Sequence, residues 1–176
     1  MRVLEIEGVQ RSLSHLDPFI VAIPKKGRDG GDLRVRVILG LHVISRACDQ
    51  GETGNLTDEN GRQRMFSEER YAFSLKLRPL MTQIILEKHY CWESSDRNRK
   101  LNYAVLNAPP AERRRVSSGV HRVAYFHVYP GDSRDSSVNL FVNSCHERNI
   151  NLDRIKRRFD LHYVLRKCLY EQKRMP

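Results

Sequence analysis

Residues 120–146 carry the clearest structural signal in the chain: VHRVAYFHVY (120–129), PGDSRD (130–135) and SSVNLFVNSCH (136–146). The two outer runs are rich in β-branched and aromatic residues, whereas Pro, Gly and Asp stand between them. This pattern is typical of two antiparallel strands joined by a turn. The sequence therefore predicts a β-hairpin over residues 120–146.

The simplest register of this hairpin places Tyr129 opposite Ser136 and His121 opposite Ser144. Residues two apart on a strand share a face, so His146 would join His121 and Ser144 at the open end of the hairpin. A one-residue slip would reverse these relations, because the side-chain period of a strand is two.

Two imidazoles close to arginines fit metal-independent RNA cleavage. That reaction needs a base for the 2′-hydroxyl proton, an acid for the leaving 5′-oxygen and a cation over the phosphorane. The candidates for these roles are His121, His146, Arg122 and Arg148. A structural or surface role for the histidines stays open beside this hypothesis. His127, which this register places opposite Val138, is best interpreted as a packed residue.

Strands are also predicted at residues 3–6, 19–23, 33–44 and 100–106, from short apolar runs and from alternation. The run KKGRDGGD (25–32) predicts a Gly-rich turn that joins 19–23 to 33–44, with Lys25, Lys26 and Arg28 placed to touch phosphates.

Helices are predicted over residues 67–89, kinked or divided at Pro79, and over 151–174. Segregated strands and helices indicate an α+β fold. We expect a single domain (1–176) with an antiparallel sheet of about five strands and two main helices packed on one face.

Two long polar segments are predicted to be exposed loops. Residues 49–63 are acidic and could receive a protein partner. Residues 107–119 contain a Pro pair and the triplet Arg113, Arg114 and Arg115, which suits non-specific contact with phosphates.

The chain is strongly basic, with 31 Lys+Arg against 21 Asp+Glu, a net charge of +10 and 23 Arg against 8 Lys. A basic domain rich in guanidinium groups favours a nucleic-acid or other polyanionic partner, although the charge could simply aid solubility. The candidate contacts are Arg97, Arg99, Arg113, Arg114, Arg115, Arg154, Lys156, Arg157, Arg158, Arg166 and Lys167.

Several classes of protein are disfavoured by the sequence. The N-terminus has no apolar signal core and the longest nearly apolar run, 37–45, is too short for a membrane span, so we expect a cytoplasmic protein without a membrane partner. The four cysteines form no CxxC pair. His89 with Cys91, and Cys145 with His146, could be considered for zinc, but adjacent strand residues diverge. No metal and no cofactor are therefore expected.

These observations favour a nucleic-acid-binding or polyanion-binding protein that acts as an accessory regulator or inhibitor. A small, toxin-like, metal-independent ribonuclease is the alternative. The order of helix, strand, hairpin and basic helix from residue 67 onward is loosely similar to ribonuclease toxins of the RelE/barnase kind. This similarity concerns architecture alone, and whether the chain is an enzyme stays open.

Overall fold

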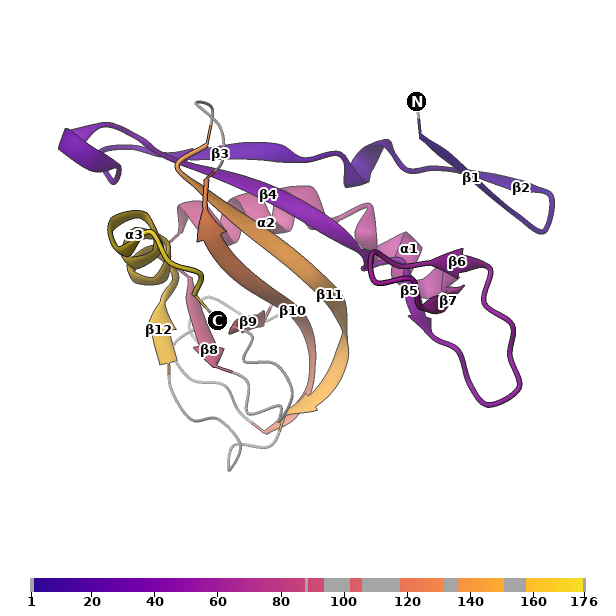
Figure 1. Ribbon diagram of the computed structural model, residues 1–176. Helices are drawn as coiled ribbons and strands as arrows, with labels where there is room; N and C mark the ends of the chain where they lie inside the picture. Colours follow the sequence, from indigo (N-terminus) through magenta and orange to yellow (C-terminus); the bar gives the residue numbers. More distant parts are fainter. Residues whose placement is uncertain are drawn as a thin grey trace.

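The computed structural model describes residues 2–87, 89–93, 102–105, 118–131, 136–150 and 158–175, with 102–105 described for the backbone alone. It is an α+β fold (Figure 1). The helices are α1 (Glu68–Ser74), α2 (Leu77–Leu86) and α3 (Leu161–Glu171), with short 3₁₀ turns at Ser14–Leu16 and Arg28–Gly30.

The largest sheet has seven strands in the order β12-β8-β9-β10-β11-β4-β3. These strands are β3 (Phe19–Ile23), β4 (Leu33–His42), β8 (Tyr90–Glu93), β9 (Asn102–Val105), β10 (Gly119–Pro130), β11 (Val138–Ile150) and β12 (Arg158–Asp160). All neighbours are antiparallel except β11 and β4, which run parallel. The prediction of an antiparallel sheet of about five strands is therefore correct only in outline.

Two smaller sheets complete the described strands. A hairpin pairs β1 (Val3–Ile6) with β2 (Val9–Ser12). A three-stranded sheet combines β5 (Ser45–Ala47), β7 (Gln63–Phe66) and β6 (Leu56–Thr57). The segment 49–63, predicted as a loop, thus contains β6 and reaches the first residue of β7. Residues 106–117 of the predicted loop 107–119 lie outside the described residues.

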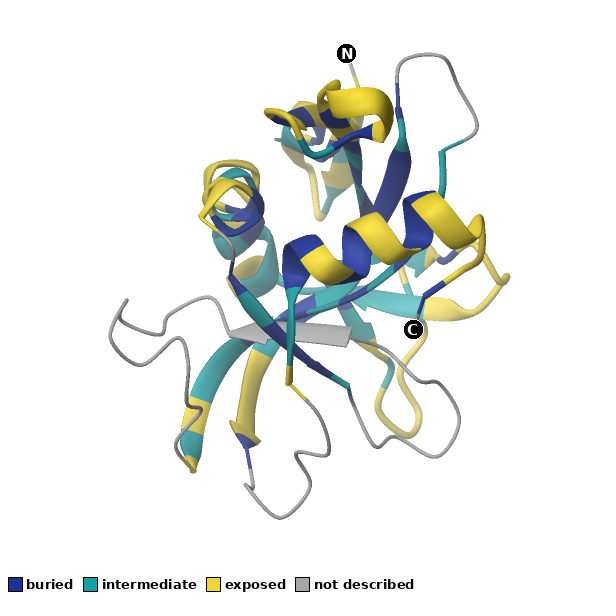
Figure 2. Ribbon diagram, turned by 90° about the vertical axis from the view of Figure 1, so that its left-hand side faces the viewer, coloured by how far each residue is buried: buried dark blue, intermediate teal, exposed yellow. Residues whose placement is uncertain are grey.

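The main core lies between the seven-stranded sheet and the helices α2 and α3. Inward-facing strand residues such as Val37, Phe126 and Leu140 belong to the same buried cluster as Met81 of α2 and Leu165 of α3. Both helices therefore pack into the same core as the sheet, whereas the expected pair of main helices is matched only in part, because the described chain has three helices. Figure 2 shows buried and exposed residues alternating along α3, the pattern of an amphipathic helix.

The predicted helix 67–89 is divided into α1 and α2. Ser67 caps α1 by accepting the Arg70 backbone N–H, and the break falls at residues 75 and 76. Pro79 is the third residue of α2. A proline is tolerated there because the first backbone N–H groups of a helix have no partner within the helix.

The register of the β10–β11 hairpin differs from the prediction. Tyr129 pairs with Asn139 rather than Ser136, because the Ser137 backbone N–H donates to the Arg34 carbonyl and draws this end of β11 toward β4. A bulge between Val142 and Ser144 then shifts the register by one more residue.

This register has different consequences along the hairpin. His127 lies opposite Phe141 and not opposite Val138, so the predicted surroundings of His127 were wrong. Beyond the bulge the observed register differs from the predicted register by an even number of residues. His121 and His146 therefore share a face, as expected, although His121 lies opposite Arg148 and not Ser144.

The predicted helix 151–174 is shorter than expected. Residues 151–157 lie outside the described residues, and Arg158–Asp160 forms strand β12, which pairs with β8. Helix α3 begins at Leu161 because the Asp160 side chain accepts the His162 backbone N–H at 2.7 Å. It ends before Gln172, whose φ of 52° is left-handed. No helix in the described part of the chain is long and apolar enough to span a bilayer.

Candidate functional site

The loop between β3 and β4 is held against α3. The Arg28 guanidinium donates to the Leu169 carbonyl near the end of α3 at 2.8 Å. The loop is also closed on itself, because the Gly27 backbone N–H donates to the Gly31 carbonyl at 2.8 Å. These contacts bring Lys26 beside a helix that lies far away in the sequence.

Helix α3 turns one stripe of side chains outward. Its apolar side, which includes Leu161, Leu165 and Cys168, is buried in the core. The opposite side carries Tyr163, Arg166, Lys167 and Tyr170, all of them exposed. Residues at positions i, i+3, i+4 and i+7 lie on one face of a helix, so these four side chains form a continuous outward stripe.

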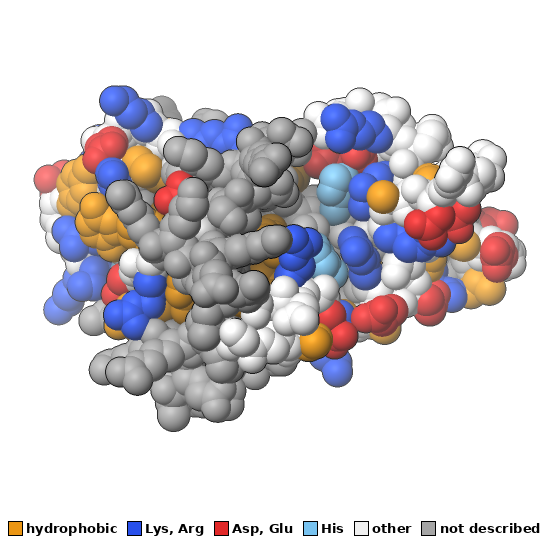
Figure 3. Space-filling view, turned by 90° about the horizontal axis from the view of Figure 1, so that it is seen from below, with side chains coloured by type: hydrophobic (Ala, Val, Ile, Leu, Met, Phe, Trp, Pro, Cys, Tyr) orange, Lys and Arg blue, Asp and Glu red, His pale blue; other side chains and the backbone are white. Residues whose placement is uncertain are grey.

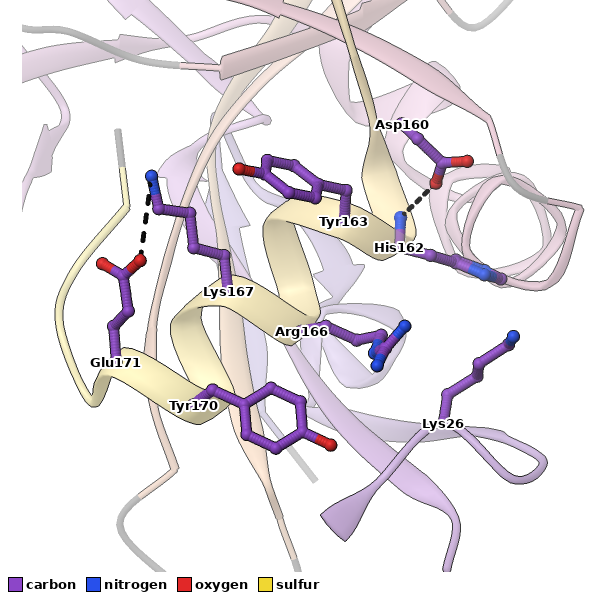
Figure 4. Close-up of a pocket in the computed structure, with 8 residues that line it drawn as sticks. All are labelled: Lys26, Asp160, His162, Tyr163, Arg166, Lys167, Tyr170 and Glu171. Carbon is purple, nitrogen blue, oxygen red and sulfur yellow. Dashed lines mark hydrogen bonds and ion pairs between the residues drawn. The ribbon is translucent and has the colours of Figure 1, made fainter. Parts of the chain in front are cut away.

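A groove of about 490 Å³ lies between this stripe and the β3–β4 loop. We call it the α3 groove. Figure 4 shows Arg166 extending toward the side of the groove on which Lys26 stands, whereas Lys167 points toward Glu171. The lining residues are Lys26, Asp160, His162, Tyr163, Arg166, Lys167, Tyr170 and Glu171.

The cations of the α3 groove outnumber its carboxylates. Lys26, Arg166 and Lys167 line it together with Asp160 and Glu171, a balance of three positive against two negative groups. Glu171 lies 3.9 Å from Lys167, and Asp160 caps the helix. Lys26 and Arg166 are thus the cations best placed to meet an external anion.

Two aromatic rings flank the basic residues. Tyr163 is 55% exposed and Tyr170 is 52% exposed. The Arg166 guanidinium lies 5.7 Å from the centre of the Tyr170 ring, within the range of a cation–π contact. The groove therefore presents charge and flat apolar surface side by side.

His162 lies at the buried edge of the groove. Its Nε2 interacts with the Ile85 carbonyl oxygen, which can only accept, so Nε2 carries the proton. Its Nδ1 is buried and has no hydrogen-bond partner among the described residues. In the neutral ring this Nδ1 is an unused acceptor.

The hairpin residues predicted for RNA cleavage are only partly brought together. His121 and Arg148 lie directly opposite each other. His146 is the diagonal neighbour of His121, and the Cα atoms of such a pair are about 7–8 Å apart. Arg122 points to the other face of β10. There it pairs with Glu147 at 3.0 Å and Glu69 at 3.2 Å and covers the Phe73 ring.

His146 lies in an environment that disfavours its charge. Burial and the positive charges of Arg70, Arg148 and Arg122 lower its pKa to about 4. Its ring stacks on Tyr125 with centroids 5.4 Å apart, and its Nδ1 is buried without a partner among the described residues. Figure 3 shows histidine side chains bordered by Lys and Arg near the middle of the face seen from below.

This lowered pKa predicts a loss of stability in mild acid. Between pH 6.5 and about 4 the unfolded chain protonates His146 while the folded chain does not, so the free energy of unfolding falls with falling pH. The variant His146→Phe keeps an aromatic ring but cannot titrate. We expect its melting temperature to depend less on pH across this window than that of the natural protein. Thermal melts at closely spaced pH values check this, and an equally steep variant profile would contradict it.

Most other predicted cations cannot be placed. Arg97, Arg99, Arg113, Arg114, Arg115, Arg154, Lys156 and Arg157 lie outside the described residues. Arg158 is described, but on β12, where its guanidinium lies 4.6 Å from the centre of the Tyr90 ring. Arg166 and Lys167 are therefore the two predicted contacts that line the groove.

The acidic segment 49–63 uses much of its charge internally. Arg46 binds both Asp49 and Glu52, and the pKa of Glu52 is lowered to about 2 mainly by its hydrogen bond to Arg46. The buried Asp58 pairs with His42 at 2.9 Å, and this contact lowers the pKa of Asp58 to about 2. A protein partner at this segment stays a prediction.

The cysteines considered for zinc are packed as apolar groups. Cys91 and Cys145 belong to the core, and burial raises the pKa of each thiol to about 12. Within the described ranges no three His, Cys, Asp or Glu side chains are grouped so that they could hold a metal ion.

Sequence reasoning missed the two tyrosines and His162. The i, i+3, i+4, i+7 spacing of Tyr163, Arg166, Lys167 and Tyr170 was the available signal, because it marks one polar face of the predicted helix. Lys26 was considered as a phosphate contact, but its position beside α3 depends on the tertiary fold.

Fold and site together define an α+β protein with a basic groove that is flanked by tyrosines. A model of the YjaZ family matches residues 3–169, nearly the whole chain, so the protein belongs to the YjaZ family. No curated protein and no solved structure matches the chain.

Proposed function

We propose that the protein binds nucleic acid or another polyanion in the α3 groove, in the cytoplasm, as an accessory regulator or inhibitor. The observation that carries this proposal is that Lys26 and Arg166, from two segments distant in the sequence, line the same groove. Ammonium and guanidinium groups donate charge-assisted hydrogen bonds to phosphate or sulfate oxygens. The net charge of +10 would add long-range attraction for the same partner.

Removal of the two groove cations is expected to weaken binding to a labelled nucleic acid and to reduce its salt dependence. Each phosphate contact contributes about 0.7 to 0.9 to the slope of log K against log salt. Lys26→Gln with Arg166→Gln should therefore flatten the slope by about 1.5 in fluorescence anisotropy titrations.

The matched control replaces one exposed lysine and one exposed arginine outside the groove, Lys76→Gln with Arg62→Gln. This control changes the net charge by the same amount and should leave most of the slope intact. Equal losses in both double variants would assign binding to net charge alone. An unchanged slope in the groove variant would remove the α3 groove as the binding site.

The hairpin face supports metal-independent RNA cleavage as a second candidate function. His121, His146 and Arg148 share this face, and the pKa of His146 near 4 leaves its imidazole neutral at pH 7. In this proposal His146 takes the 2′-hydroxyl proton and the 2′-oxygen attacks phosphorus. His121 protonates the 5′-oxygen as its bond to phosphorus breaks, and Arg148 stabilises the phosphorane.

A further inference from the structure

We infer that the α3 groove selects a single nucleic-acid strand, whose unpaired bases stack on Tyr163 and Tyr170 while its phosphates lie at Lys26 and Arg166. This inference rests on the proposed function and specifies the ligand. Its basis is the juxtaposition of exposed aromatic rings and cations on one helical stripe.

The two rings are set apart along the helix with the cations between them. Tyr163 and Tyr170 are seven residues apart, about 10 Å along the helix axis at 1.5 Å per residue. Arg166 lies between them in the sequence and extends into the groove toward Lys26 (Figure 4). A strand lying along α3 would meet aromatic surface, positive charge and aromatic surface in turn.

The exposure of these rings argues for a ligand with flat apolar faces. They are the two aromatic residues among the exposed large apolar side chains of the described chain. A phosphate or sulfate group gains little from a phenol ring, because its recognition depends on charge and hydrogen bonds. A nucleobase gains from the ring directly, since every base has a π-face that can stack on tyrosine.

The same rings allow the groove to distinguish a single strand from a duplex. In a duplex both faces of each internal base are already covered by neighbouring base pairs, so Tyr163 and Tyr170 would find no face to contact. The bases of a single strand can be splayed out onto aromatic side chains. Arg166 can serve both parts of the ligand, because a guanidinium group binds phosphate and also stacks.

The groove has the size and openness for such an arrangement. Its volume of about 490 Å³ lies within the range of ordinary small-ligand pockets, which suits a nucleotide unit. The β3–β4 loop forms the second wall and is fixed to α3 by Arg28. Lys26 is thereby held on the side of the groove opposite the stripe.

The experiment compares three probes on the full-length protein by fluorescence anisotropy: a mixed-sequence single strand, the duplex of the same sequence, and a heparin fragment. Heparin supplies anionic groups without bases. We expect the single strand to bind most tightly. Tyr163→Leu with Tyr170→Leu should weaken single-strand binding by roughly five-fold or more per ring, with little change for heparin.

The rescue variant is Tyr163→Phe with Tyr170→Phe, which keeps both rings and removes the hydroxyl groups. It should bind the single strand nearly as tightly as the natural protein. Circular dichroism and thermal melts confirm that each variant is folded, and both tyrosines are exposed, so the leucine variant should keep its stability.

The outcomes distinguish this inference from the proposed function. Equal binding of all three probes, lost in Lys26→Gln with Arg166→Gln but unchanged in the leucine variant, would overturn single-strand selection and retain polyanion binding. Preference for the duplex would also overturn it. Failure of all three probes to bind would overturn both, and binding of an acidic protein in their place would assign the groove to protein recognition.

Discussion

Phe126→Ala is expected to lower the free energy of unfolding by about 3–5 kcal/mol, the range typical of removing a buried phenylalanine ring. Phe126 is fully buried at the middle of β10 and belongs to the core cluster shared with α2 and α3. Loss of the ring would leave a cavity in the core that the sheet shares with α2 and α3. Urea unfolding followed by the fluorescence of the single, buried Trp92 measures the change.

The control for this variant is Leu86→Ala at the end of α2, where the side chain is 48% exposed. An exposed truncation of this kind changes stability by about 0.5 kcal/mol or less. If both variants lost the same small amount, Phe126 would not anchor the layer between sheet and helices. A changed m-value would instead indicate an altered unfolded state.

The strands marked by apolar runs or by alternation were predictable from the sequence. Residues 3–6 and 19–23 are strands with the predicted bounds, and the Gly-rich turn joins β3 to β4 as expected. The strict alternation over residues 33–44 also predicted β4, which covers Leu33–His42. The α+β class follows from the same signal, because strands and helices occupy separate parts of the chain.

The short strands and the exact pairing were not predictable in the same way. β5, β6 and β12 have three residues or fewer, too few to establish a period. The parallel contact of β4 with β11 joins segments about a hundred residues apart, and no local pattern specifies it. This contact and the bulge near Asn143 set the hairpin register, so a register derived from the turn alone was wrong.

The candidate site was predictable only in its parts. The basic side of the closing helix was visible from composition and spacing, so Arg166 and Lys167 were named. The groove itself needs the β3–β4 loop to reach α3, and the bond from Arg28 to Leu169 spans 141 positions in the chain. The exposure of Tyr163 and Tyr170 depends in turn on which side of α3 faces the core.

Cleavage of single-stranded RNA in EDTA is expected to fall at least about 100-fold in His146→Ala and in His121→Ala, the lower range for loss of a general base or acid. Arg148→Ala should also reduce it, by removing positive charge near the phosphorane. Gel analysis of the fragments should show 2′,3′-cyclic phosphate ends, because the attacking nucleophile is the neighbouring 2′-oxygen. His127→Phe is the matched control, since His127 lies on the same hairpin but packs against the rings of Phe141 and Tyr129.

The pH dependence of this cleavage follows from the environment of His146. Unperturbed imidazoles would place the acidic limb of the rate profile near pH 6.5. Burial and the three nearby arginines lower the pKa of His146 to about 4, and a base acts only when it is unprotonated. The acidic limb of the rate profile should therefore lie near pH 4, so that the rate rises as the pH increases through about 4. An acidic limb that stays near pH 6.5, or cleavage unaffected by both histidine variants, would remove His146 as the base and leave binding in the α3 groove as the function to be tested.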